Sequence, residues 1–154
     1  MRVAIAIPTL NEEENIGELI DSINATNYAE KEIWVIDDGS EDRTIEIAKS
    51  KGARVLENFP GRRGPAFGWN KVAKLTEAEI ICPLGADFRV YDKDFFVKCL
   101  KEFEDEKVVS VFTSYRTIQD TLLEKVVTQK EGISIEPRFI RKKIFLAVGG
   151  FPEI

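Results

Sequence analysis

Histidine is absent from the 154-residue sequence, and its absence excludes several kinds of catalytic site. Without histidine the chain holds no Ser–His–Asp or Cys–His triad, no HExxH zinc site and no histidine general base. The two cysteines, Cys82 and Cys99, are too few for a structural zinc site. Because each lies in an apolar stretch, we predict two buried free thiols, and this cysteine usage favours a reducing, cytoplasmic setting.

Long apolar runs and an excess of positive charge are also missing. The longest apolar runs, Val3–Ile7 and Ile144–Val148, have five residues, too few to span a bilayer or to form the core of a signal peptide. With 22 basic and 27 acidic residues the net charge is −5, which argues against a nucleic-acid partner. We interpret the two basic clusters, Arg62-Arg63 and Arg141-Lys142-Lys143, as solvated surface patches.

The residues that are present, 44% apolar and 32% charged, are typical of one globular domain, residues 1–154. Short apolar runs alternate with helical patterns along the whole chain. This alternation predicts the α/β class, as a three-layer αβα sandwich with a mostly parallel sheet and helices on both faces.

The spacing of apolar residues sets the expected elements. We expect strands over 3–7, 33–36, 54–56, 80–84, 108–112 and 138–140. We expect helices over 11–23, 43–51, 65–75, 96–103, 118–130 and 142–148. Asn11 is the predicted N-cap of the first helix, and Pro83 weakens the fourth strand because it removes a ladder donor.

Polar and flexible residues follow three of the predicted strands. They are Pro8–Glu13 after the first strand, Asp37–Asp42 after the second and Gly85–Asp87 after the fourth. In open α/β sheets, ligands bind beyond the carboxyl ends of the strands, so these segments are site candidates. Ordinary turn chemistry uses the same residue types and is sufficient to explain each segment when it is taken alone.

Taken in order, these segments resemble the motifs of family 2 glycosyltransferases, and the resemblance covers essentially the whole chain. Residues 3–12 resemble the opening strand with its P-x-x-N-E turn, and residues 35–44 match D-D-G-S-x-D-x-T. Residues 63–70 loosely match the G-x-x-x-A-R-N helix start, residues 84–87 lie where the family has D-x-D, and residues 148–151 contain G-G-F. The first two motifs together are specific, whereas the third and fifth are weak alone.

The resemblance implies a Rossmann-like, nucleotide-diphosphosugar transferase fold and an inverting glycosyltransferase. Such an enzyme moves a sugar from a nucleotide-diphosphate sugar to an acceptor hydroxyl. Residues 1–90 are then the nucleotide-binding half, and residues 91–154 are the start of an incomplete acceptor half. The sequence does not identify the acceptor. Many relatives act on lipid-linked or polysaccharide acceptors, so the resemblance is compatible with a protein that works at the membrane surface.

The resemblance also implies roles for residues near the nucleotide. The backbone around Pro8, Thr9 and Leu10 lines its slot, Asp38 hydrogen-bonds the base, and Glu12 lies beside the ribose or base. A carboxylate accepts strongly from ring N–H groups and ribose hydroxyls. The alternative for Asp38 is a turn-capping aspartate.

Three further positions concern the diphosphate. Gly64 lets backbone approach the substrate, and Arg63 either contacts a phosphate or is an ordinary exposed loop arginine. In Gly85-Ala86-Asp87, Asp87 matches the last acid of D-x-D and is the predicted ligand of a divalent cation, Mn²⁺ or Mg²⁺. Gly85 departs from the motif, because it has no side chain to bind ribose or steady the metal.

No residue is assigned as the catalytic base. In the family the base belongs to an E-D pair shortly after G-G-F, and Glu153 matches the acidic position before that pair. Three explanations are open: a truncated chain, a donor-binding domain without activity, or a carboxylate elsewhere. A nucleotidyltransferase on a related fold ranks last, because it requires a glycine-rich loop directly after the first strand, and residues 8–11 contain no glycine.

Overall fold

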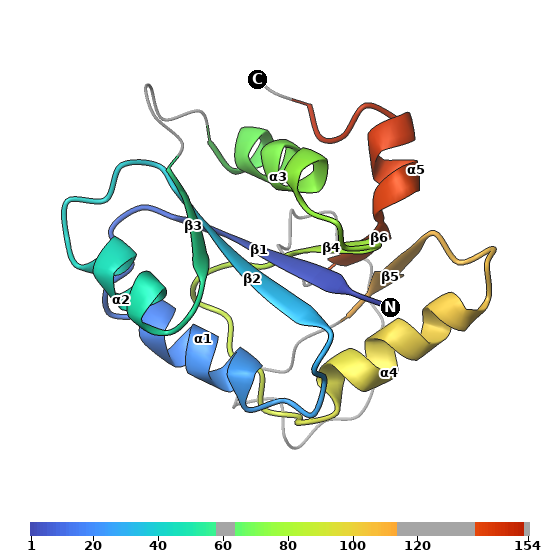
Figure 1. Ribbon diagram of the computed structural model, residues 1–154, viewed down its shortest axis with the longest axis horizontal. Helices are drawn as coiled ribbons and strands as arrows, with labels where there is room; N and C mark the ends of the chain where they lie inside the picture. The colour runs from blue at the N-terminus through green and yellow to red at the C-terminus, as the bar shows by residue number, and fades with distance from the viewer. Residues whose placement is uncertain (58–63, 114–137, 153–154) are drawn as a thin grey trace, which may run out of the picture.

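The computed structural model describes residues 1–57, 64–113 and 138–152 (Figure 1). The elements, in chain order, are β1 (Val3–Thr9), α1 (Ile16–Asn24), β2 (Lys31–Asp37), α2 (Thr44–Ser50), β3 (Arg54–Glu57), α3 (Gly64–Leu75), β4 (Ile80–Pro83), α4 (Phe95–Lys101), the 3₁₀ helix η1 (Glu102–Glu104), β5 (Ser110–Phe112), β6 (Arg138–Arg141) and α5 (Lys142–Ala147). This order confirms the predicted alternation of strands and helices.

The strands form one six-stranded sheet in the order β3-β2-β1-β4-β6-β5. β1 lies at its centre and runs parallel to β2 and β4, and β2 runs parallel to β3. β6 is antiparallel to both β4 and β5, which makes this edge of the sheet different from the rest. The α/β class and the mostly parallel sheet are therefore confirmed.

Helices cover both faces of the sheet, with α1, α2 and α4 on one side and α3 and α5 on the other (Figure 1). The alternation of β1 explains the two packings, because successive side chains of a strand point to opposite faces. Val3, Ile5 and Ile7 belong to the core under α1 and α4, whereas Ala4 and Ala6 belong to the core under α3 and α5. The small alanines on the second face leave room for α3 to lie close to the sheet.

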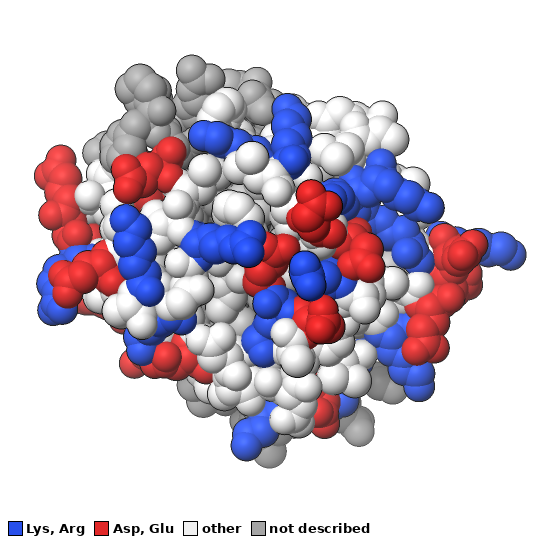
Figure 2. All heavy atoms as spheres, in the orientation of Figure 1, with Lys and Arg blue, Asp and Glu red and all other residues white. Residues whose placement is uncertain are grey.

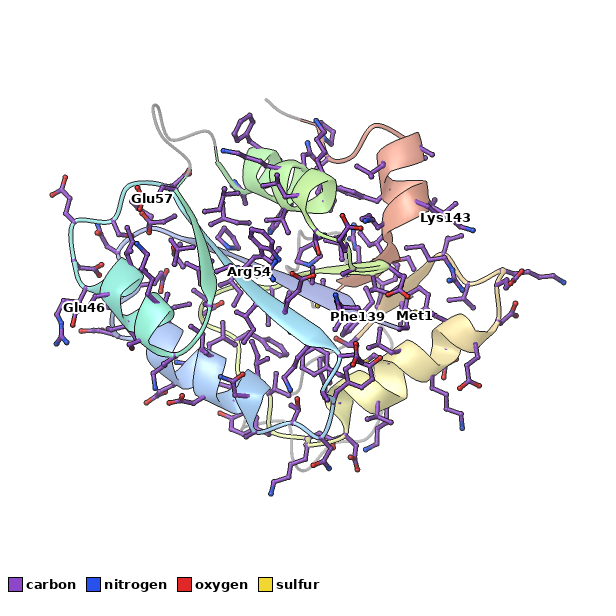
Figure 3. All side chains as sticks on the ribbon, viewed as in Figure 1. Met1, Glu46, Arg54, Glu57, Phe139 and Lys143 are labelled. Atoms are coloured by element: carbon purple, nitrogen blue, oxygen red, sulfur yellow. The ribbon has the colours of Figure 1, made fainter. Side chains whose placement is uncertain are left out.

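The antiparallel edge is attached to α4 through aromatic contacts. Phe139 of β6, labelled in Figure 3, is fully buried. Its ring centroid lies 5.8 Å from that of Phe95 and 5.9 Å from that of Phe96. Edge-on and tilted rings at these separations are the favoured aromatic arrangements. The short strand β6 is thus fixed by its side chain as well as by its ladder.

Both cysteines are buried free thiols, as predicted. Burial raises the pKa of Cys82 well above its ordinary value, with a smaller contribution from Cys99. Burial, with the nearby charges of Asp92 and Glu102, raises the pKa of Cys99 to about 11. The two thiols therefore remain protonated at neutral pH.

The second basic cluster is only partly a solvated patch, so that interpretation was wrong for two of its residues. The Arg141 guanidinium donates to three backbone carbonyls at 2.6–3.0 Å, those of Phe103, Asp105 and Val108. The Lys142 ammonium donates to the carbonyl of Thr76 at 2.7 Å, whereas Lys143 is exposed. Over the face in Figure 2, acidic and basic side chains are interspersed.

Two of the expected elements have clearly different boundaries in the structure, and a third cannot be compared with it. The first helix begins at Ile16 rather than near Asn11, which has a φ of 55° and so cannot be helical. The strand expected over 108–112 is limited to Ser110–Phe112. The helix expected over 118–130 lies outside the described residues. Within the residues described, no helix is both long enough and apolar enough to cross a membrane.

Candidate functional site

The sheet order brings together the loops that follow β1, β2 and β4. β1 lies between β2 and β4 and runs parallel to both, so the carboxyl ends of the three strands lie side by side. We call this end of the strands the sheet edge from here on. Thr9 is in register with Asp37, and the N–H of Asp38 donates to the Thr9 carbonyl at 2.9 Å. On the other side, Ala6 is in register with Pro83, and the chain continues through Leu84 into Gly85. The candidate segments therefore share one edge, as the rule for parallel sheets predicts.

The two aspartates at the end of β2 have different surroundings. Asp37 is fully buried, and its carboxylate accepts from the Thr9 hydroxyl at 3.0 Å and from the N–H groups of Gly39 and Ser40 at 2.9 and 2.8 Å. The Ser40 hydroxyl donates to the same carboxylate at 2.5 Å. Asp37 is thus the turn-capping aspartate, which was the alternative considered for Asp38.

Asp38 is half-buried and faces the start of α3. Its carboxylate accepts from the N–H of Gly64 at 3.1 Å, so two of the predicted nucleotide contacts, Asp38 and Gly64, lie side by side. Gly64 has a φ of 74°, which favours glycine at the beginning of this helix. Arg63, the neighbouring prediction, lies outside the described residues.

The loop after β1 is tied to the loop after β2 through its backbone. The N–H of Asn11 donates to the Ser40 hydroxyl, and the Asn11 side-chain oxygen accepts from the N–H of Glu41, both at 2.9 Å. The N–H of Glu12 donates to the Thr44 hydroxyl at 2.8 Å. The prediction that Asn11 caps the first helix was therefore wrong, because its side chain bridges two loops instead.

Asp42 forms another tie between these loops. Its carboxylate accepts from the N–H of Glu13 at 3.1 Å and from the N–H and hydroxyl of Thr44 at 2.9 and 2.5 Å. Burial favours the protonated acid, but the hydrogen bonds from Thr44 and Glu13 outweigh it and lower the pKa of Asp42. The ionised carboxylate thus helps to hold the two loops together.

The remaining predicted contacts of the β1 loop differ in exposure. Leu10 is 38% exposed at the sheet edge, Pro8 is half-buried and Thr9 is buried. The half-buried carboxylate of Glu12 accepts from the side-chain amide of Asn15 at 2.9 Å. Glu12 is therefore oriented by the segment that leads into α1.

In the loop after β4, an exposed carboxylate follows a buried residue. Ala86 is buried, Asp87 is exposed, and the N–H of Phe88 donates to the Gly85 carbonyl at 3.2 Å to close a turn. A Cβ on Gly85 would lie 2.8 Å from the Asp87 Oδ1 atom. The glycine that departs from the family motif therefore makes room for the Asp87 carboxylate.

Asp87 can contribute one ligand to a divalent cation. Along the residues that the structure describes, no cluster of three or more Asp, Glu, Cys or His residues forms a metal cage. The same residues donate no hydrogen bond to the Asp87 carboxylate, which leaves its oxygens available. Magnesium-type cations are commonly held by one or two carboxylates together with water and substrate phosphates, so this donor set fits such an ion.

Two contacts of the site were not predicted from the sequence. The Asn70 side chain accepts from the N–H of Phe151 and donates to its carbonyl, both at 2.9 Å, so α3 holds the Gly149-Gly150-Phe151 segment. Arg89 contacts the Asp87 loop and α1. The two weakest motifs contained Asn70 and Phe151, but nothing in the sequence indicated that they pair.

Solved structures of nucleotide-sugar enzymes share this fold. A mannosyltransferase from Pyrobaculum calidifontis in complex with GDP-Man and Mn²⁺ is 22% identical, with a TM-score of 0.80 over 99% of this chain and 48% of its own. TarS 1–349 of S. aureus in complex with UDP-GlcNAc is 19% identical, with a TM-score of 0.81 over 99% and 49% of the two chains. At these identities the likeness shows the fold, which is the A-type glycosyltransferase fold.

The model of Glycosyl transferase family 2 matches residues 4–151, and the chain therefore belongs to this family. Over 76 residues, 46% of this chain and 22% of the relative, it is 47% identical to glucosyl-3-phosphoglycerate synthase of Petrotoga mobilis. Over 117 residues, 71% of this chain and 25% of the relative, it is 33% identical to beta-monoglucosyldiacylglycerol synthase of Trichormus variabilis. The chain thus spans about a quarter of the length of these two relatives.

Proposed function

We propose that the protein binds a nucleotide-diphosphate sugar at the edge formed by the β1, β2 and β4 loops and transfers its sugar to an acceptor hydroxyl with inversion. The observation that carries this proposal is the meeting of Thr9, Asp38, Gly64 and Asp87 at one sheet edge. Family membership supports it, as do the GDP-Man and UDP-GlcNAc complexes of proteins with the same fold.

The nucleoside is recognised on the β2 side of this edge. Asp38 accepts from the base, and the backbone of Pro8, Thr9 and Leu10 forms one wall of the slot. Glu12 faces the ribose or base with the help of Asn15. The carboxylates accept hydrogen bonds that the donor's N–H and O–H groups supply, and hydrogen bonds to charged groups contribute about 1.5–3 kcal/mol each.

The diphosphate lies toward the β4 side, where Asp87 is exposed. When bound at Asp87, a divalent cation neutralises charge on the departing diphosphate. Mn²⁺ accompanies GDP-Man in the mannosyltransferase structure and UDP in the glucosyl-3-phosphoglycerate synthase of Mycobacterium tuberculosis, which supports a divalent cation here. The family resemblance also assigns Gly64 and Arg63 to the donor, and Gly64 lies beside Asp38.

Calorimetry with UDP-, GDP- and dTDP-sugars, each with and without Mn²⁺, tests the proposal. We expect one donor class to bind and Mn²⁺ to strengthen its binding. Asp38→Ala weakens binding about 10- to 100-fold in both conditions, because a charge-assisted hydrogen bond is lost. Asp87→Ala mainly removes the Mn²⁺ dependence.

Glu102→Ala is the matched control, because this exposed carboxylate begins η1, beyond α4, and belongs to none of the three loops. We expect it to bind the donor like the parent chain. If no donor class binds, the proposal is wrong. If Asp38→Ala and Asp87→Ala both bind like the parent chain, the assignment of the site is wrong.

A second candidate is a donor-binding domain without catalysis. The observation that favours it is Gly85, which leaves a single carboxylate where the family motif has two. Sugar transfer or donor hydrolysis by the 154-residue chain would exclude this candidate. Donor binding without either reaction would favour it.

A further inference from the structure

Arg89 lies between the Asp87 loop and helix α1, and its side chain is only 16% exposed. A guanidinium carries five N–H donors in a rigid fork, so it can fix several groups at once. Here it contacts both the loop and the helix. This position allows it to control how the loop after β4 is placed.

On the loop side, Arg89 holds the peptide before Asp87 and the peptide after Phe88. Its Nη1 atom donates to the carbonyl of Ala86 at 3.1 Å and to the carbonyl of Phe88 at 2.7 Å. The Ala86 carbonyl belongs to the peptide before Asp87 and the Phe88 carbonyl to the peptide after Phe88. Arg89 therefore brackets the Asp87–Phe88 segment and restricts the backbone from which the Asp87 side chain leaves. The exposed carboxylate is aimed without receiving a hydrogen bond itself from any residue that the structure describes.

On the helix side, Arg89 reaches the segment that orients Glu12. Its Nε and Nη2 atoms both donate to Oε2 of Glu18 at 3.2 Å, and Nη2 lies 3.4 Å from the side-chain oxygen of Asn15. The amide of Asn15 in turn donates to the carboxylate of Glu12. A continuous set of contacts therefore joins the nucleoside side of the edge to the Asp87 loop.

The contribution of Arg89 is orientation rather than overall stability. Its partner Glu18 is 78% exposed, and exposed ion pairs contribute little to stability. The loop has independent anchors, because Val90 is buried in the core and its N–H donates to the Ser22 hydroxyl at 3.1 Å. Loss of Arg89 therefore leaves the chain folded but frees the Ala86 and Phe88 carbonyls that bracket the Asp87–Phe88 segment.

We propose that Arg89 is a positioning residue that aims Asp87 at the cation and diphosphate, an inference that rests on the proposed function. It contacts neither donor nor cation and acts through the Ala86 and Phe88 carbonyls. Its effect falls mainly on the cation-dependent part of donor binding, because its contact with Asn15 is long, at 3.4 Å, and Asn15 bonds Glu12 through its own amide. A residue that only stabilised the fold would weaken metal-free and metal-dependent binding alike.

The test measures donor affinity with and without Mn²⁺, for the donor class that the wild-type chain binds. Arg89→Ala removes most of the strengthening by Mn²⁺, about tenfold or more, and leaves the metal-free affinity within about twofold. Arg89→Lys gives an intermediate loss, because one ammonium cannot serve both carbonyls and Glu18. Amide hydrogen exchange reports the loop directly, and Arg89→Ala raises exchange at residues 85–88.

Arg54→Ala is the matched control. Arg54 also pairs with a glutamate, Glu32, at 3.0 Å, but it stands at the beginning of β3, away from the strand ends that form the site. Arg54→Ala leaves unchanged both the strengthening of donor binding by Mn²⁺ and the amide exchange at residues 85–88. If Arg89→Ala weakens donor binding equally with and without Mn²⁺, or leaves exchange at residues 85–88 unchanged, the positioning role of Arg89 is wrong while the proposed function stands. Absence of donor binding by the wild-type chain overturns the proposed function and this inference together.

Discussion

The loops after β2 and β4 end at the same sheet edge, but they are held in different ways. The β2 loop is fixed by its own buried carboxylate, Asp37, and by repeated hydrogen bonds to the β1 loop. The β4 loop is fixed by buried side chains beneath it and by Arg89, which lies two residues beyond Asp87. The first loop is therefore held rigidly by hydrogen bonds, whereas the second presents one exposed carboxylate, Asp87, which we propose that Arg89 positions.

The difference matches what each loop is proposed to bind. A base and ribose are recognised by hydrogen bonds that need fixed partners, and a fixed wall avoids the cost of ordering it on binding. A cation shared with a diphosphate takes most of its ligands from substrate and water, so one well-aimed carboxylate is sufficient. Substitutions in the β2 loop should therefore mainly lower stability, whereas substitutions in the β4 loop should mainly change the metal dependence of donor binding.

The largest expected effect on stability comes from Asp37→Ala. Removing this carboxylate takes away the acceptor of the buried Thr9 hydroxyl and of the Gly39 and Ser40 N–H groups, and should destabilise the fold by about 3 kcal/mol. Urea unfolding measures the loss. Asp38→Ala, one residue away, is the comparison and should cost much less, because Asp38 is half-buried. Equal losses of unfolding free energy in the two variants would show that Asp37 is not the structural aspartate of the pair.

Thr44→Val tests the ties between the β1 and β2 loops and should have the next largest effect. The Thr44 hydroxyl accepts from the N–H of Glu12 and donates to Asp42, and valine keeps the shape of the side chain without these bonds. We expect a loss of about 1–2 kcal/mol in urea unfolding. Donor binding should weaken with and without Mn²⁺. A loss confined to the Mn²⁺-dependent part would contradict the assignment of this loop to the nucleoside.

Gly85→Ala tests the β4 loop and should have a smaller effect on stability. The added Cβ would lie 2.8 Å from Oδ1 of Asp87, but that carboxylate is exposed and can rotate away, so we expect a cost below about 1 kcal/mol. The Mn²⁺ dependence of donor binding should change because the carboxylate has moved. Unchanged Mn²⁺ dependence would show that the direction of Asp87 does not matter.

The last and smallest expected effect is cysteine alkylation in the native chain. It tests whether strand β4, which precedes the β4 loop, opens locally. Cys82 of β4 and Cys99 of α4 are buried, and because burial raises the pKa of each thiol, little thiolate forms at pH 8. Iodoacetamide should label neither cysteine in the native chain and both after unfolding in urea. Labelling of Cys82 faster than global unfolding would show that β4 opens locally.

The sequence predicted the sheet well because its signal is local. The buried run Val3–Ile7, with helical spacing after it, predicts a central parallel strand followed by a helix, and the structure confirms both. The boundaries were less predictable. Asn11 has the composition of a helix cap, but its side chain bonds Glu41, some 30 positions along the chain, and this contact holds it out of the helix. A local pattern carries no information about such a partner.

The candidate site was predictable in part for the same reason. The Asp37–Asp38 pair was visible in the sequence, but which carboxylate turns inward depends on strand register, because Thr9 of the neighbouring strand donates to Asp37. Arg89 carried no sequence signal beyond its place after Asp87. Its partners on α1 come from a distant part of the chain, so only the packed structure identifies them.

The sequence by itself determined the order of strands and helices, the family and the residues that follow each strand, since these depend on apolar spacing and on short motifs. The tertiary structure decided what each polar residue does there. It buried Asp37 and left Asp38 half-buried beside Gly64. It also placed Arg89 against the Ala86 and Phe88 carbonyls and paired Asn70 with Phe151. The physical reason is that a hydrogen bond joins atoms that are close in space, and packing the sheet between its helices decides which atoms those are.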